Sequence, residues 1–204
     1  DPIYDNPRAK EKIFYISDDQ YFFRSGTPRD MMRLYRTFYP GFDGQKWQGT
    51  MDKFGLDSRR KVNTFSKGMM KQLSVICGIC ANTRYLLCDE TFDGLDPVMR
   101  QAVKAIFIQE MEERGLTPVV ASHNLRELED ICESVGLLHR GGILFEKDLD
   151  EMKTGIHKVQ CIFREKALPP QVRESLEVLT VENRGALYTF TVRGAREDVE
   201  KCLE

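Results

Sequence analysis

Short apolar runs and longer amphipathic segments alternate along the chain and predict an α/β protein. The β-prone runs at residues 12–16 and 85–88 predict buried strands, and the run at 117–122 predicts a further apolar strand. Polar residues follow each of them. Between them, apolar residues recur three and four positions apart, which predicts helices at 28–39, 44–54, 97–113 and from residue 66 onward. Strands that alternate with helices in this way are typical of a parallel sheet with helices packed on it.

Helix-start residues support these assignments. Thr27 before Pro28 and Asp43 before the second helix are typical N-caps, and Pro97 suits the first turn of a helix. The first helix is predicted to turn one apolar face inward, made of Met31, Tyr35 and Phe38. In the second helix Trp47, Met51 and Phe54 form a stripe, which we expect to be core rather than a groove for a partner.

The predicted elements become shorter and mostly β toward the end of the chain. A hairpin is predicted at 135–146 across Gly141-Gly142. After residue 148, strands are predicted at 158–163, 178–182 and 187–193. Helices are predicted at 169–176 and 197–203, and a turn at 183–185. We therefore predict a core domain at 1–150, with a helical subdomain at about 21–80, and a small α+β appendage at 151–204.

Composition narrows the class of protein. The 204 residues are 41% hydrophobic and 30% charged, with a net charge of −2, which is typical of a globular protein and argues against a general nucleic-acid binder. No apolar stretch is long enough to cross a bilayer, and no signal peptide is recognisable. Cys77 and Cys80 form a single CxxC pair, which we expect to be reduced core thiols rather than a zinc or redox site.

The candidate chemistry lies at residues 85–97. An apolar run ends in Asp89 and Glu90, and Gly94 and Asp96 follow. Carboxylates at the carboxyl end of a strand lie where open α/β sheets bind ligands. One can hold Mg²⁺ and the other can orient or deprotonate a water. The alternative is a strand that ends in a solvated acidic turn.

Four segments in order resemble the ATP-binding subunits of ABC transporters. Residues 85–90 resemble the Walker B strand, and residues 94–97, Gly-Leu-Asp-Pro, match the D-loop. Residues 65–69, Phe-Ser-Lys-Gly-Met, resemble the signature loop, in the form found in bacterial ABC-2 type exporters. His123 stands where the family has its switch histidine. The resemblance covers roughly residues 12–145 and implies a P-loop NTPase-like core.

The resemblance implies an ATPase that uses ATP and Mg²⁺. Asp89 would position the metal, Glu90 would polarise the attacking water, and His123 would contact the γ-phosphate. The alternative is that His123 has a purely structural role. However, His123 stands at a strand end beside the acid pair, which favours contact with the γ-phosphate.

In the family, the signature loop acts on the ATP held by the other subunit of a dimer. Ser66 and Gly68 would therefore act in trans, and Asp96 would link the two sites. Lys67 stands where the family usually has glycine. It would either add positive charge near the γ-phosphate or point into solvent.

Residues after the first strand match the family's Q-loop, which senses nucleotide. The usual glutamine is replaced by Asp18, although Gln20 is close by. An ordinary acidic turn is the alternative. We expect the neighbouring run Tyr21-Phe22-Phe23 to contact the membrane subunit.

The implied partners are a second ATPase subunit and an integral membrane permease, without nucleic acid, at the cytoplasmic face of the membrane. No GxxxxGK[ST] loop occurs in the sequence. In the family that loop precedes the strand at 12–16, so we expect a missing N-terminal lobe and weak nucleotide binding by residues 1–204 alone. Two alternative functions remain open at this point: a non-transport ABC ATPase, and a degenerate interaction module without ATPase activity.

Overall fold

The structure, a computed structural model, describes residue 4, residues 6–162 and residues 176–203. The chain divides into two compact units, Asp1–Ile131 and Cys132–Glu204. This division falls earlier in the chain than the domain boundary predicted at residue 150. The predicted hairpin at 135–146 thus belongs to the second unit.

A parallel sheet is the centre of the first unit. Its strands are β1 (Ile13–Ile16), β2 (Tyr85–Asp89) and β3 (Thr117–Ala121), in that order. The register pairs Ile16 with Cys88, and Asp89 with Ala121. Because parallel strands in this register end together, the residues that follow all three strands leave the same edge of the sheet.

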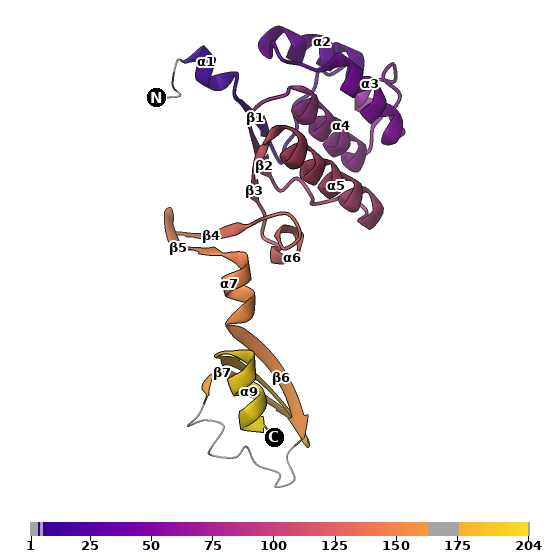
Figure 1. Cartoon of the computed structure of the whole chain (residues 1–204). Coiled ribbons are helices and arrows are strands. Elements are labelled where there is room, and N and C mark those ends of the chain that lie inside the picture. The colour runs from indigo at the N-terminus through magenta and orange to yellow at the C-terminus, as the bar shows by residue number, and fades with distance from the viewer. Residues whose placement is uncertain (1–3, 5, 163–175, 204) are drawn as a thin grey trace. The chain divides into compact units, whose positions relative to one another are not determined.

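Four long helices lie on one side of this sheet (Figure 1). They are α2 (Pro28–Phe38), α3 (Gly44–Lys53), α4 (Lys67–Cys80) and α5 (Pro97–Arg114). The shorter helical segments of the first unit are α1 (Pro7–Lys10), the 3-10 turn η1 (Val62–Thr64) and α6 (Leu125–Leu128).

The predicted helix starts are confirmed by capping hydrogen bonds. Thr27 and Asp30 form a capping box at α2: Thr27 Oγ1 accepts from the Asp30 N–H, and the Asp30 carboxylate accepts from the Thr27 N–H at 2.9 Å. Asp43 Oδ1 accepts from the first N–H groups of α3. These bonds satisfy donors that a helix N-terminus otherwise leaves unpaired.

The core lies between the sheet and the helices. Four strand residues that face the helices are almost completely buried: Phe14, Ile16, Leu86 and Cys88. Trp47 and Met51 are also buried, which confirms that the α3 stripe belongs to the core. Phe38 is 60% exposed, so the prediction that it faces inward is wrong. It is the last residue of α2.

The opposite face of the sheet is open in the described part of the first unit. Tyr15 is 57% exposed and Val119 is 54% exposed. The strand at 12–16 was predicted to be buried, and this is correct for Phe14 and Ile16, which face the helices. The apolar strand predicted at 117–122 alternates between exposed and half-buried residues. Successive strand side chains point to opposite faces, and the long helices lie on one of them.

Cys77 and Cys80 lie inside α4 and are both fully buried. Burial raises the pKa of the Cys77 thiol well above its ordinary value, and it raises the pKa of Cys80 to about 12. Because the thiolate is the reactive and metal-binding form, protonated thiols in this position behave as small apolar groups.

The second unit begins with a hairpin and ends with a small α+β layer. Its elements are β4 (Ser134–His139), β5 (Gly142–Asp148), α7 (Leu149–Thr154), β6 (Ile156–Ile162), β7 (Glu177–Arg184), β8 (Leu187–Arg193) and α9 (Arg196–Leu203). The hairpin turn is formed by Arg140 and Gly141, with φ of 49° and 80°. Two positive φ values match the right-handed twist of a hairpin. The turn was predicted at Gly141-Gly142, but Gly142 already belongs to β5.

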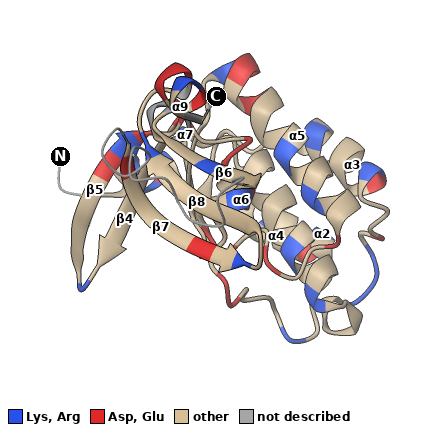
Figure 2. Cartoon of the chain, turned by 90° about the horizontal axis from the view of Figure 1, so that it is seen from below, with Lys and Arg blue, Asp and Glu red and all other residues tan. Residues whose placement is uncertain are grey.

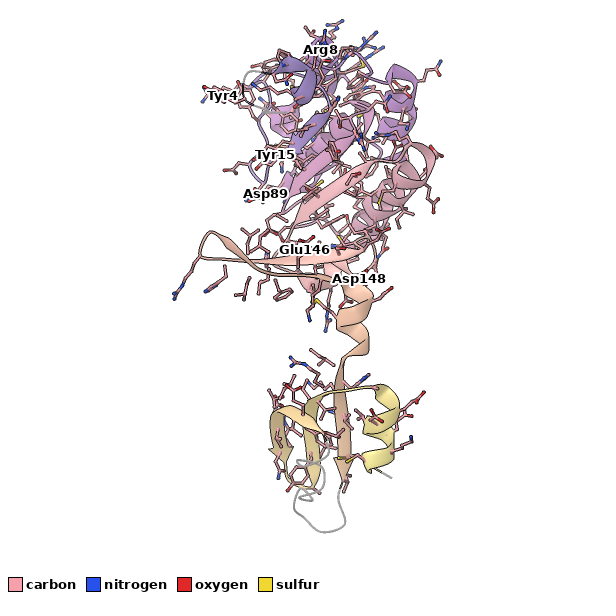
Figure 3. All side chains as sticks on the ribbon, turned by 60° about the vertical axis from the view of Figure 1, so that its left-hand side comes forward. Tyr4, Arg8, Tyr15, Asp89, Glu146 and Asp148 are labelled. Carbon is pink, nitrogen blue, oxygen red and sulfur yellow. The ribbon has the colours of Figure 1, made fainter. Side chains whose placement is uncertain are left out.

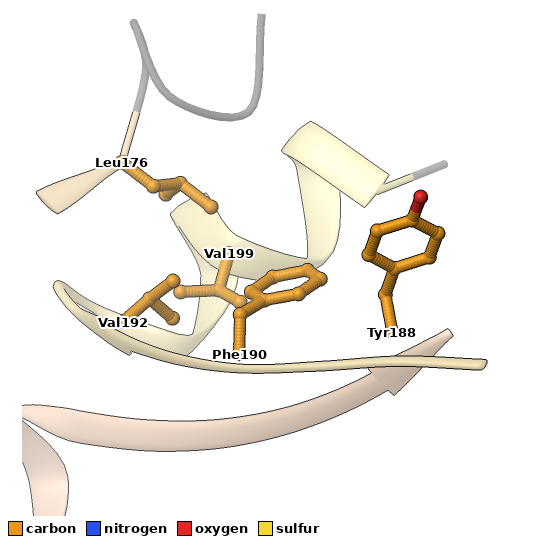
Figure 4. Packing of buried hydrophobic residues seen from close by; sticks show 5 residues of the cluster. All are labelled: Leu176, Tyr188, Phe190, Val192 and Val199. Atoms are coloured by element: carbon orange, nitrogen blue, oxygen red, sulfur yellow. The ribbon is translucent and has the colours of Figure 1, made fainter. Parts of the chain in front are cut away.

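The second unit has a core of its own. Its sheet has the order β6–β8–β7, and five buried residues pack between it and α9 (Figure 4): Leu176, Tyr188, Phe190, Val192 and Val199. The turn predicted at 183–185 begins at Gly185, because β7 continues through Arg184. Residue 163 and most of the helix predicted at 169–176 lie outside the described residues.

Charges of both signs occur on the same helices (Figure 2). Among the described residues, no helix has both the length and the apolar character that crossing a membrane requires.

The close packing of α4 on the sheet makes a testable prediction at Gly78. A Cβ at this position would lie 2.8 Å from Leu86 Cδ1 and 3.2 Å from Ile16 Cδ1. We expect Gly78→Ala to lower the free energy of unfolding by about 1–3 kcal/mol through overpacking. The control is Gly49→Ala in α3, where a Cβ meets nothing within 4 Å. It should raise stability by up to about 1 kcal/mol. Urea unfolding of both variants measures this, and a neutral Gly78→Ala would contradict the packing.

Candidate functional site

The predicted acid pair lies at the carboxyl end of the central strand. Asp89 is the last residue of β2, and Glu90 follows it with a φ of 45°, in the left-handed region. The Glu90 N–H donates to the Ala121 carbonyl at 3.0 Å, so the pairing between β2 and β3 extends one residue beyond the strands. This bond aims the Glu90 side chain toward the loop that follows β3.

That loop brings His123 to Glu90. His123 Nδ1 lies 3.0 Å from Glu90 Oε2, and the exposed fractions of the two side chains are 74% and 26%. The hydrogen bond to Glu90, together with the charge of the carboxylate, raises the pKa of His123 above its ordinary value. A protonated His123 therefore donates to Glu90, and Asp89, Glu90 and His123 lie at one edge of the sheet.

Tyr15 is a neighbour of the acid pair that sequence reasoning missed. Its hydroxyl donates to Asp89 Oδ2 at 3.1 Å, from the open face of the sheet (Figure 3). Tyr15 lies between the buried Phe14 and Ile16 in β1, so its side chain points to the opposite face of the sheet. This orientation places its ring beside the next strand on the exposed face.

Lys71 lies in α4, the helix that follows the signature-like loop, and it contacts the predicted Q-loop at Asp18 and the predicted Walker B strand end at Glu90. Its ammonium group donates to Asp18 Oδ1 at 3.1 Å and also to the backbone carbonyl of Glu90. The Lys71 side chain is 10% exposed, whereas that of Asp18 is 58% exposed. Asp18 therefore pairs with the helix that follows the signature loop. A lysine inside a mostly apolar helix was the available signal, but its partners are distant in sequence.

The signature-like residues form the N-terminus of α4. Ser66 is the N-cap, and its Oγ accepts from the Met69 N–H at 3.2 Å; Ser66 and Lys67 are exposed. A Cβ on Gly68 would lie 3.5 Å from the Gly94 carbonyl, so this loop adjoins the turn that follows Glu90. The first backbone N–H groups of a helix bind anions well.

Asp96 forms the N-cap of α5, where Oδ1 accepts from the N–H groups of Val98 and Met99 at 3.0 Å each. Among the described residues, neither Ser66 nor Asp96 hydrogen-bonds to the group formed by Asp89, Glu90 and His123. The sheet edge thus unites three of the predicted site residues, and Lys71 ties Asp18 to them. The two helix N-termini present Ser66 and Asp96 to the surface.

The described residues contain no group of three or more His, Cys, Asp or Glu side chains that could hold a metal ion. A carboxylate at this edge would therefore share a metal with ligands from elsewhere. Mg²⁺ in nucleotide sites takes one or two carboxylates and completes its octahedron with water and phosphate oxygens. Asp89 fits that arrangement, since Tyr15 engages only one of its two oxygens.

Curated proteins with related sequences are ATP-binding proteins of ABC transporters, although no family model matches the chain. "ABC transporter ATP-binding protein YtrB" of Bacillus subtilis is 27% identical over 198 residues, which is 97% of this chain and 67% of YtrB. "Lantibiotic transport ATP-binding protein SrtF" of Streptococcus pyogenes is 28% identical over 70% of this chain and 62% of its own. "Bacitracin transport ATP-binding protein BcrA" of Enterococcus faecalis is 24% identical over 69% and 46%. The chain spans about two thirds of these relatives or less.

Solved structures with a similar fold are ABC ATPases. "Structure of ATP binding subunit of ABC transporter" has a TM-score of 0.65 at 23% identity, over 72% of this chain and 63% of that one. A dimeric post-hydrolysis structure of the ATP-binding cassette MJ0796, bound to ADP and Pi, has a TM-score of 0.62 at 18% identity, over 70% and 65%. The predicted P-loop NTPase-type α/β fold is therefore confirmed. In sequence, the chain is similar to ATP-binding proteins of ABC transporters, and in fold it is similar to a solved ATP-binding subunit of an ABC transporter.

Proposed function

We propose that this protein is the ATP-binding and ATP-hydrolysing subunit of an ABC transporter, and that it powers transport through a separate membrane permease. The observation that carries the proposal is the meeting of Asp89, Glu90 and His123 at the carboxyl ends of neighbouring parallel strands. The names of its relatives support the same activity. The substrate would be selected by the permease.

Asp89 would hold Mg²⁺, directly or through a water, and the metal would neutralise charge on the nucleotide phosphates. Tyr15 fixes one carboxylate oxygen, Oδ2, by its hydrogen bond, and the other oxygen would bind the metal. Partners of this kind orient metal ligands and are often needed for affinity.

Glu90 would orient the attacking water, and His123 would contact the γ-phosphate. The 3.0 Å contact between Glu90 Oε2 and His123 Nδ1 supports these roles, because it brings a carboxylate and an imidazole next to each other. Phosphoryl transfer requires little covalent chemistry from the protein, so positioning and charge neutralisation account for most of the catalysis.

Ser66 and Gly68 would close over the ATP bound by a second ATPase subunit, and Asp96 would connect the two sites. The exposed N-termini of α4 and α5 support this role, since both present helix-end N–H groups and polar side chains to the surface. Lys67, exposed beside Ser66, would add positive charge there. The similar MJ0796 cassette is dimeric in its post-hydrolysis state, which favours the same arrangement.

The permease contact is proposed at residues 21–23. Tyr21 is 78% exposed and Phe23 is 39% exposed, directly after the loop that holds Asp18. Exposed aromatic residues of this kind are typical of protein interfaces. The site of action would be the cytoplasmic face of a membrane.

Replacing Glu90 tests the proposed chemistry. We expect Glu90→Gln in the full-length protein to lower the kcat for ATP hydrolysis by about 10²–10⁴-fold, because a neutral amide cannot polarise the water. ATP binding should persist, and an ATP-dependent dimer should accumulate in size-exclusion chromatography. The control is Glu112→Gln, an exposed change on α5. Hydrolysis at the wild-type rate in Glu90→Gln would remove Glu90 from its role.

The pair formed by Glu90 and His123 predicts a pH dependence. The carboxylate raises the pKa of His123, so the ion pair stabilises the fold below the ordinary histidine pKa. That contribution is lost as the pH rises through the raised pKa. In Glu90→Gln we expect the pKa of His123, followed by NMR, to fall toward its ordinary value. A pKa of His123 that is the same in both proteins would show that the contact does not persist in solution.

The Lys71 bridge predicts a loss of stability. Lys71→Met leaves Asp18 and the Glu90 carbonyl without this buried cation, and charged hydrogen bonds contribute about 1.5–3 kcal/mol. We expect a decrease of about 1–3 kcal/mol in the free energy of unfolding in urea. Lys67→Met, at an exposed position on the same helix, should change it by less than about 0.5 kcal/mol. Equal effects of the two substitutions would refute the bridge.

A further inference from the structure

The loop that carries His123 is held by a buried carboxylate. Glu127, in α6, has a side chain that is 7% exposed. Its Oε2 accepts from Ser122 Oγ at 2.9 Å, and its Oε1 accepts from Asn124 Nδ2 at 3.2 Å. Ser122 and Asn124 are the residues on either side of His123. The same carboxylate therefore fixes the loop on both sides of the histidine.

A buried carboxylate requires compensation for its lost hydration, and Arg100 of α5 supplies it. Arg100 Nη1 lies 3.5 Å from Glu127 Oε1. Arg100 Nη2 also donates to the Leu95 carbonyl at 3.3 Å, one residue before the N-cap Asp96. A single side chain thus connects the turn at residues 94–97 with the carboxylate that holds the histidine loop.

A second ion pair joins α5 to the residues that directly follow α6. Lys104 lies one turn farther along α5, and its Nζ is 2.8 Å from Asp130 Oδ2. Both ion pairs hold residues 127–130 against α5, so this packing does not set Glu127 apart from Asp130. Glu127 in addition accepts hydrogen bonds from Ser122 and Asn124, the residues that flank His123.

We propose that Glu127 is a positioning residue for the reaction: it holds His123 next to Glu90, and Arg100 ties this loop to the turn that begins α5. Glu127 does not touch the reacting atoms; it acts through the histidine loop. Because the D-loop-like turn would lie at the interface with the second subunit, Arg100 and Glu127 would align His123 when that interface closes. The inference rests on the proposed ATPase function for its catalytic consequence.

The test compares two carboxylates that pair with α5. In the full-length protein, Glu127→Ala should lower kcat about 10–100-fold, as the loss of partners that orient active-site ligands does, with KM changed less than about threefold. Asp130→Asn, which removes the neighbouring ion pair, should leave kcat within about twofold of wild type. Glu127→Gln, which can still hydrogen-bond to Ser122 and Asn124, should restore part of the lost kcat.

A second measurement does not depend on hydrolysis. Without Glu127, His123 should move away from Glu90, so its pKa in an NMR titration should fall toward the ordinary value. The charge of Glu127 also raises this pKa by a smaller contribution. Glu127→Gln removes that charge but keeps the hydrogen bonds, so it should lower the pKa of His123 less than Glu127→Ala does, and Asp130→Asn should not change it. His123→Asn assigns the signal. If wild-type protein hydrolyses no ATP, the proposed function fails while this titration still decides the position of His123.

Three results would overturn the inference: an unchanged kcat and His123 pKa in Glu127→Ala, equal losses of kcat in Glu127→Ala and Asp130→Asn, or an unchanged His123 pKa with a lowered kcat. If Glu127→Ala fails to fold, Glu127→Gln and Arg100→Met take its place. Both should then lower kcat and the pKa of His123 relative to Asp130→Asn, and the absence of these effects would overturn it equally.

Discussion

The parallel register of β1, β2 and β3 is the constraint on which the rest of the site depends. Since Ile16 pairs with Cys88, and Asp89 with Ala121, the three strands end at one edge. The register alone therefore brings together side chains that are separated by many residues in the sequence. A shift of one residue in β2 would turn Asp89 to the other face of the sheet and separate it from Tyr15.

Polar contacts around this edge then set the directions of the side chains. Glu90 adopts a left-handed backbone conformation, which costs about 1–2 kcal/mol for a residue other than glycine. Its N–H bond to Ala121 and the contact of its carbonyl with Lys71 offset that cost. Strained backbone of this kind often marks functional positions. The helices bury the other side of the sheet and give the edge a rigid support.

Local patterns in the sequence predicted most of the first unit. Caps such as Thr27 and Asp43 act on their own helices, and the acid pair follows its own strand, so neighbours in the sequence carry that information. Tyr15, Lys71 and Glu127 were missed because their partners lie elsewhere in the chain, and no spacing rule predicts such contacts. The open face of the sheet was missed for a related reason: a run of apolar residues does not reveal on which faces helices will pack.

A crystal structure of the full-length protein with Mg²⁺ and a non-hydrolysable ATP analogue is the most direct test of the shared site at the sheet edge. The account predicts the metal within direct or water-mediated reach of Asp89, the γ-phosphate beside His123, and Ser66 of a second subunit on the same nucleotide. A nucleotide bound away from this edge, or one contacted by Ser66 of its own subunit, would contradict it.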